Sequence, residues 1–92
     1  MTPQRAEEIA IAALTWLVGN DELFQVFSGA SGLDAGQIRA QAENRHFLAS
    51  VLEFITMDDA WVIAFCDAEG LKYDQPLTAL RTLPGAEAVH WT

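Results

Sequence analysis

Residues 44–70 carry the clearest structural signal of the chain and read NRHFLASVLEFITMDDAWVIAFCDAEG. Apolar residues in the first half recur at the spacing of one helix face, and they are Phe47, Leu48, Val51, Leu52, Phe54 and Ile55. A second apolar series follows Asp58 and consists of Trp61, Val62, Ile63, Phe65 and Cys66. Aspartate is favoured at the residue that caps a helix. The stretch therefore predicts two amphipathic helices separated at Asp58, and each must bury its apolar side against other elements.

The first part of the chain predicts a long helix over residues 3–18. Thr2 followed by Pro3 is a helix-start signal, because proline is tolerated where the backbone N–H has no helical acceptor. From Ile9 onward this segment is apolar on nearly all sides, and Gly19 ends it. A helix of this kind is usually contacted from several directions. We therefore expect it to be the central helix of the domain.

A second helix is predicted after Asn20, which can cap it. Its buried side is expected to consist of Leu23, Phe24, Val26 and Phe27. The run at residues 28–32, SGASG, is rich in turn-forming residues and predicts the end of that helix.

A capping box predicts a third helix over residues 35–43. Asp34 and Gln37 have the box spacing, and Leu33 and Ile38 have the spacing of a hydrophobic staple around it.

Three further signals complete the helix assignment. Asn44 is the expected cap of the fourth helix, and Met57 and Val62 lie at the staple positions of the fifth. Gly70 is the expected left-handed end of the fifth helix. A short sixth helix is predicted over residues 75–83.

The fold class predicted by these elements is all-α. No segment alternates with period two for long enough to form a strand. We expect one compact domain over residues 1–85, with five or six short helices around a central apolar first helix. Residues 86–92 are expected to form a C-terminal tail.

The charge balance limits the classes of partner. Five Lys and Arg residues against 13 Asp and Glu residues give a formal net charge of −8. Such a chain is repelled by nucleic-acid phosphates and anionic membranes, so we expect neither as a partner. The longest apolar-rich run, residues 9–18, has about half the length that spans a bilayer, and no targeting signal precedes it. These features predict a cytoplasmic protein, and Cys66, as the one cysteine, is expected to be a reduced core thiol.

No residue pattern predicts catalysis. His46 and His90 are far apart in the sequence and lack a nucleophile at a suggestive spacing. The pair Asp58 and Asp59 is explained by helix capping, and the glycines lack the features of a phosphate-binding loop. We therefore predict a non-enzymatic protein with no cofactor and no metal site. One alternative stays open, namely that the acidic residues Asp67, Glu69 and Asp74 bind a cation.

The second and third predicted helices have the outline of a helix-turn-helix. In that arrangement Gln37, Arg39 and Gln41 would be presented to DNA, and Arg45 would follow. Glutamine and arginine are suitable readers of base edges. The net negative charge opposes this reading, so a nucleic-acid-associated regulator is kept as the alternative function.

The chain resembles a small bacterial family known as domain of unknown function 3572, over about residues 6–83. The resemblance rests on NDEL at residues 20–23 with Phe27, on GLD at 32–34 with Ile38 and Arg39, on FL at 47–48 and VLEF at 51–54, and on Asp58, Phe65 and CDA at 66–68. Ala35 departs from the family pattern, which has a proline after the capping acid. The resemblance implies a small cytoplasmic protein, mostly of alphaproteobacteria, without an assigned activity. It carries over no functional residue.

Three residues are candidates for partner binding. Trp61 and Trp91 are aromatic residues that an acidic domain could expose, and exposed aromatic area favours protein binding. Arg39 is the charged residue of the family pattern that could act beyond the scaffold, although an ion pair with Glu43 would also explain it. We predict a protein–protein interaction module that binds another protein or a second copy of itself.

Overall fold

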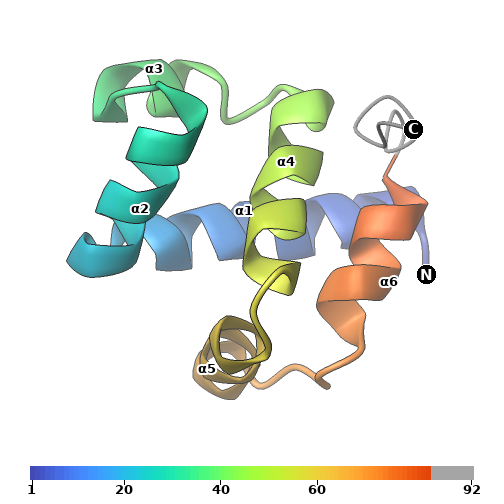
Figure 1. Ribbon diagram of the computed structural model, residues 1–92. Helices are drawn as coiled ribbons and strands as arrows, with labels where there is room; N and C mark the ends of the chain where they lie inside the picture. Colours follow the sequence, from blue (N-terminus) through green and yellow to red (C-terminus); the bar gives the residue numbers. More distant parts are fainter. Residues whose placement is uncertain (84–92) are drawn as a thin grey trace.

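The structure is a computed structural model that describes residues 1–83, and within this range it contains six helices and no strand (Figure 1). The helices are α1 (Pro3–Val18), α2 (Asp21–Ser31), α3 (Ala35–Ala40), α4 (Arg45–Thr56), α5 (Asp59–Glu69) and α6 (Gln75–Thr82). The predicted all-α fold is confirmed. None of these helices has the length and hydropathy needed to cross a lipid bilayer. The predicted tail at 86–92, with His90 and Trp91, lies outside the described residues.

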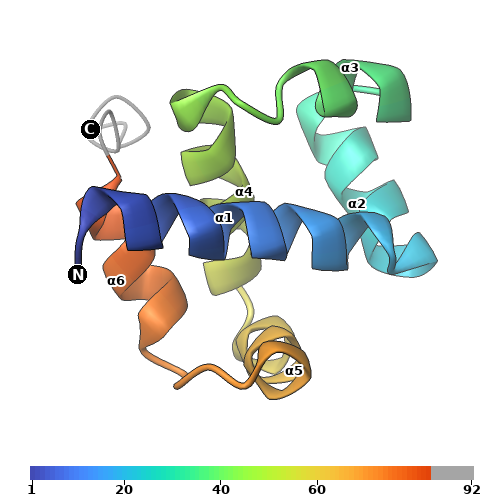
Figure 2. The same cartoon turned by 180° about the vertical axis from the view of Figure 1, so that it is seen from behind.

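Helix α1 is the central element, as predicted. It packs against α2, α4, α5 and α6. Figure 1 shows it crossing behind α4, with α2 and α6 on either side, and Figure 2 shows its other side uncovered. The uncovered side carries Ile11, Thr15 and Val18, which are all exposed. The central helix is therefore buried along one broad face and is not enclosed on all sides.

Buried alanines allow α1, α4 and α6 to approach closely. Helix α1 contributes Ala6, Ala10 and Ala13, which lie on one face because they are spaced by four and three residues. Helix α4 contributes Ala49 and α6 contributes Ala79, and all five side chains are completely buried. These three helices also make the densest backbone contacts of the fold. A methyl side chain leaves room for a neighbouring helix to come near.

Aromatic side chains fill the wider space between α2, α4 and α5. The ring of Phe27 in α2 meets Phe47 and Phe54 of α4 edge-on, at centroid distances of 6.0 and 5.1 Å. Phe54 in turn stacks on Trp61 of α5 at 4.9 Å. These edge-to-face and stacked arrangements are the favoured geometries of aromatic pairs. The rings connect α2 to α4 and α5, while α1 holds the backbone of α2 in place.

The helix starts predicted from capping residues are confirmed. Thr2 Oγ1 accepts from the Arg5 amide at 3.1 Å, and Asn20 Oδ1 accepts from the Leu23 amide at 3.3 Å. The capping box between Asp34 and Gln37 has both of its hydrogen bonds, each 2.9 Å long. The side chains of Asn44 and Asp58 likewise accept from backbone amides at the starts of α4 and α5. Gly70 ends α5 in the left-handed conformation, with φ of 68°.

Two predicted boundaries are wrong. Helix α2 continues to Ser31, so the expected turn at residues 28–32 is reduced to Gly32, whose φ is 75°. The Ser28 hydroxyl donates to the Leu33 carbonyl and supports the chain reversal from within the helix. Helix α3 ends at Ala40 instead of residue 43, because Asn44 Nδ2 and the Asn44 amide both donate to Gln41 and draw the chain into a turn.

The expected burial of two side chains is also wrong. Met57 is 76% exposed, so it makes no staple with Val62. Val26 is 52% exposed and Phe24 is only partly buried, whereas Leu23 and Phe27 are buried. On a helix of 3.6 residues per turn, Phe24 and Val26 fall on opposite edges of the stripe that Leu23 and Phe27 centre. The buried face of α2 is therefore narrower than expected.

Two alanine substitutions of glycine are expected to change stability in opposite directions. Gly70→Ala should lower the free energy of unfolding by about 1 kcal/mol, because a Cβ disfavours positive φ. Gly29→Ala should raise it by roughly 0.5–1 kcal/mol, since this residue is inside α2 and a Cβ there meets no atom within 4 Å. Urea unfolding followed by circular dichroism measures both changes. Equal effects of the two variants would contradict the assigned conformations.

Candidate functional site

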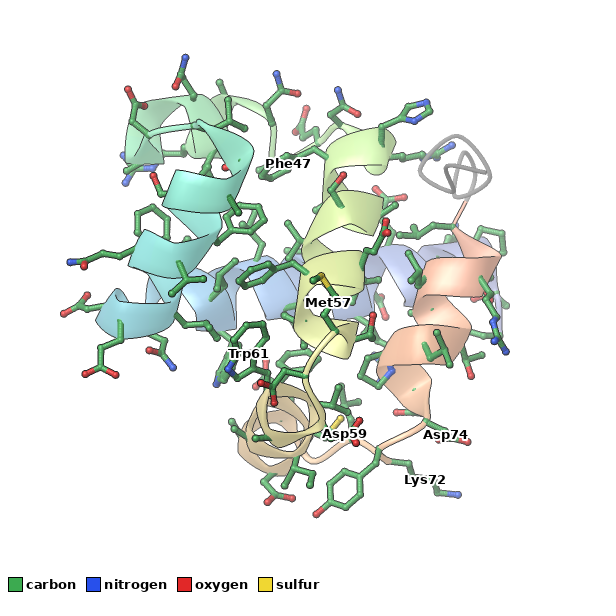
Figure 3. All side chains as sticks on the ribbon, viewed as in Figure 1. Phe47, Met57, Asp59, Trp61, Lys72 and Asp74 are labelled. Carbon is green, nitrogen blue, oxygen red and sulfur yellow. The ribbon has the colours of Figure 1, made fainter. Side chains whose placement is uncertain are left out.

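Trp61, a predicted partner-binding residue, lies half-buried on α5 at the side that faces α1 and α2 (Figure 3). One face of its indole stacks on Phe54, with an interplanar angle of 25°. Its position on α5 follows from the start of the helix, where Asp58 Oδ1 accepts from the Ala60 amide at 2.8 Å. Trp61 is therefore anchored in the aromatic contacts of the core and is also accessible from outside.

A groove of about 260 Å³ opens beside Trp61, and we name it the α2–α5 groove. Its lining is made mainly of apolar and aromatic side chains from α1, α2 and α5, and consists of Trp16, Asn20, Glu22, Leu23, Val26, Trp61 and Ala64. Trp16 is held from behind by Phe65, at a ring distance of 5.7 Å. The groove thus presents two indoles and the exposed side chain of Val26 on a surface that the core keeps in place.

The two helices that border the α2–α5 groove, α2 and α5, carry negative charge. Helices α2 and α5 contain no Lys or Arg, and their acidic residues are Asp21, Glu22, Asp59, Asp67 and Glu69. Glu22 is part of the groove lining itself. The ion pairs among residues 1–83 lie on other elements, Arg5 with Glu8 at 3.3 Å and Arg45 with Glu7 at 3.5 Å. The acidic charges of α2 and α5 are therefore not compensated by those pairs.

Arg39, the second predicted residue, lies on α3 at a different opening. A pocket of about 210 Å³, which we name the α1–α3 pocket, is lined by Arg39 together with mostly apolar residues of α1, α2 and α3. Within residues 1–83, Arg39 and Glu43 do not form the expected ion pair. It depended on both residues sharing a helix, and α3 ends at Ala40. The structure therefore separates Arg39 from Trp61 and places them in different openings.

The other residues considered for DNA contact are largely engaged in local bonds. Gln37 Oε1 accepts from the Asp34 amide and Gln41 Oε1 accepts from Asn44 Nδ2, both at 2.9 Å. Arg45 Nε lies 3.5 Å from Glu7 Oε2. Helix α3 has six residues. The corner between α2 and α3 exists, but its side chains serve helix capping and ion pairing.

Cys66 and His46 lie in contrasting environments. Cys66 is completely buried, as predicted, and its Sγ donates to the Lys72 carbonyl at 3.4 Å. Burial raises the pKa of the thiol, and the nearby charges of Asp67 and Asp74 raise it further. His46 is exposed in the first turn of α4. A thiol that is buried and protonated is a poor nucleophile.

The acidic residues at the end of α5 and after it are dispersed. Asp67 Oδ1 accepts from the Tyr73 hydroxyl at 2.8 Å, and this hydrogen bond raises the pKa of Tyr73. Figure 3 shows Asp74 beside the start of α6, with Lys72 pointing away from the fold. Over residues 1–83 no three His, Cys, Asp or Glu side chains are grouped so that they could hold a metal ion. The cation site considered for Asp67, Glu69 and Asp74 thus has no structural support there.

A family model described as a protein of unknown function (DUF3572) matches residues 3–86. The chain belongs to this family. The matched range includes all six helices and both openings, so the family model covers the α2–α5 groove and the α1–α3 pocket. No curated protein and no solved structure matches the chain. The family membership inferred from the sequence is confirmed, and it assigns no activity to either opening.

The sequence predicts Trp61 and Arg39 as binding residues, and each lines an opening, but it does not predict the residues that line those openings with them. Val26 is predicted to be buried, and the sequence predicts no binding role for Trp16 or Glu22, which line the groove with it. The available signal was the position of Val26 at the edge of the apolar stripe of α2. A residue at such an edge borders a neighbouring element and can line an opening between them.

The buried thiol makes a prediction about pH. The pKa of Cys66 is raised in the folded state, so above about pH 8.5 the unfolded chain releases this proton while the folded chain keeps it. The free energy of unfolding should therefore fall as pH rises, and the fall should be shallower in Cys66→Ala. Urea unfolding at several pH values between about 7 and 10 measures both slopes. Parallel slopes for the two proteins would contradict the raised pKa.

Proposed function

We propose that this chain is a non-enzymatic interaction module whose α2–α5 groove binds a basic, amphipathic segment of another protein. The observation that carries the proposal is the groove itself, which combines the two indoles of Trp16 and Trp61 with Glu22 and with helices that lack basic residues. Aromatic side chains in a concave surface are typical anchors of protein interfaces. The acidic surroundings favour lysine or arginine on the partner.

Charge also selects another protein over a second copy of this chain. Two copies, each with a formal charge of −8, repel one another. The acidic residues of α2 and α5 would face a partner copy with the same sign of charge if the groove were a symmetric dimer contact. A basic partner instead gains from the same charges. We place this interaction in the cytoplasm, where a single thiol such as Cys66 stays reduced.

The alternative of a nucleic-acid-associated regulator receives less support from the geometry. Of its four candidate side chains, Gln37, Gln41 and Arg45 have partners within the domain. Arg39 alone provides no basic surface that could offset the net charge. We therefore place this alternative second.

A direct test uses a 14-residue helical peptide of leucine and lysine, with the two residue types on opposite faces, and two-dimensional NMR of the labelled protein. We expect the indole N–H signals of Trp16 and Trp61 and the amides of α2 and α5 to shift during the titration. Val26→Lys and Glu22→Lys should each weaken binding by about tenfold or more, since one places a positive charge in the apolar lining and the other reverses the charge there. Binding should also weaken as salt is added.

Two matched variants separate the groove from general attraction between opposite charges. Met57→Lys adds the same side chain at an exposed position outside the groove, and Glu43→Lys makes the same reversal near α4. Both should leave the affinity within about twofold of the original protein. If Glu43→Lys weakens binding as much as Glu22→Lys does, the peptide recognises only the net charge, and the proposal fails.

A further inference from the structure

The α1–α3 pocket is a second opening, on the other edge of α2. Phe24 lines it from α2, whereas Val26, on the opposite edge of that helix, lines the α2–α5 groove. The floor is apolar and includes Leu14 and Ile38, which are buried. The pocket remains open because α3 has only six residues and faces it with Ala35 at its first turn. Its volume of about 210 Å³ is therefore left unfilled by the core.

The two polar side chains of this pocket, Thr15 and Arg39, differ in whether they are already engaged in hydrogen bonds. Thr15 Oγ1 donates to the Ile11 carbonyl at 3.0 Å, so its proton is already used inside α1. Arg39 is exposed. Within residues 1–83 its guanidinium forms no ion pair and no side-chain hydrogen bond. The nearby acid Asp34 accepts from the Gln37 amide at 2.9 Å in the capping box. The pocket therefore combines an apolar lining with one guanidinium that is available to bind a ligand.

We propose that the α1–α3 pocket binds a small aliphatic carboxylate, with the hydrocarbon chain against Leu14, Phe24 and Ile38 and the carboxylate paired with Arg39. Guanidinium groups recognise carboxylates through two parallel hydrogen bonds, which a neutral or cationic head group cannot accept in the same way. A cavity of about 150 Å³ accommodates benzene, so this pocket has room for roughly eight carbon atoms. The inference is independent of the proposed function, because it concerns a different opening and a ligand of opposite charge.

Three probes with the same eight-carbon chain test the proposal, namely octanoate, 1-octanol and octylamine, each titrated into the labelled full chain and followed by two-dimensional NMR. We expect octanoate to shift the amides of Val18, Phe24, Ile38 and Ala42 and to approach saturation below about 10 mM. Octanol and octylamine should bind at least about tenfold more weakly, because they lose the pairing with Arg39.

Two variants assign the binding to this pocket. Arg39→Gln should weaken octanoate binding by about tenfold or more, whereas Arg81→Gln, an equal change on the last turn of α6, should leave it unchanged. Ala35→Leu should also weaken binding, because the larger side chain occupies the cavity without altering charge. Ala35 is exposed, so thermal unfolding should show both variants of α3 to be folded.

Three results would overturn the inference. Unchanged octanoate affinity in Arg39→Gln would show that Arg39 takes no part, and shifts that survive Ala35→Leu would place the ligand elsewhere. Absence of specific shifts with octanoate up to about 10 mM would show that the pocket does not take this carboxylate.

Discussion

The close packing of α1 against α4 and α6 is the constraint on which the rest of the structure depends. Five fully buried positions on these helices are alanines, where a larger side chain would push the helices apart. Residues 6, 10 and 13 of α1 meet this requirement together, and Ala49 and Ala79 meet it on the partner helices. Larger residues such as Ile9 and Leu17 supply most of the buried apolar area around them. Packing on α4 and α6 thereby holds the long helix over the span from Ala6 to Ala13.

Helix α2 packs against the domain through large aromatic side chains and not through alanines. There the backbones stand further apart, and the space is filled by rings, with Phe27 between Phe47 and Phe54 and with Trp61 against Phe54. These rings leave two openings along the edges of α2. The α2–α5 groove lies along one edge of α2, and the α1–α3 pocket lies along the other. The same helix, α2, therefore contributes a side chain to each, and the two openings differ in charge because Glu22 lines one and Arg39 the other.

The charge difference between the openings has a local origin. Glu22 belongs to the first turn of α2, where the helix dipole favours an acid, and Arg39 to the last turn of α3, where it favours a base. Both residues thus have a role in helix stability that is independent of any ligand. Each nevertheless borders an apolar surface that it does not cover. This combination gives two neighbouring openings opposite preferences for the charge of what they bind.

The helices could be predicted from the sequence because their starts are encoded within a few residues. Asp34 with Gln37, and Asn44 or Asp58 alone, satisfy backbone amides at the start of their own helix, so no knowledge of the tertiary structure was needed. The end of α3 was missed because it depends on a bond from Asn44 back to Gln41, a competition between two neighbouring elements.

The candidate site could be predicted only in part, for a related reason. Trp61 was recognisable as an aromatic residue on a helix near the surface, but its companions Trp16 and Val26 come from other helices. Periodicity marks the centre of a buried stripe clearly and its edges poorly. Whether an edge residue is covered is decided by how far the neighbouring helix stands, and that distance is set by packing. Trp91 remains a prediction.

Amide hydrogen exchange of the free protein, measured residue by residue at increasing denaturant, tests most directly whether close packing of α1 holds the fold. Amides of Ala10, Ala13 and Leu14 in α1, with Val51 and Leu52 in α4, should exchange only through global unfolding, and their rates should rise together with denaturant. Amides of α3 should exchange through local openings with little dependence on denaturant. If α1 exchanged through local openings like α3, it would not be the element that holds the domain together, and the account would be wrong.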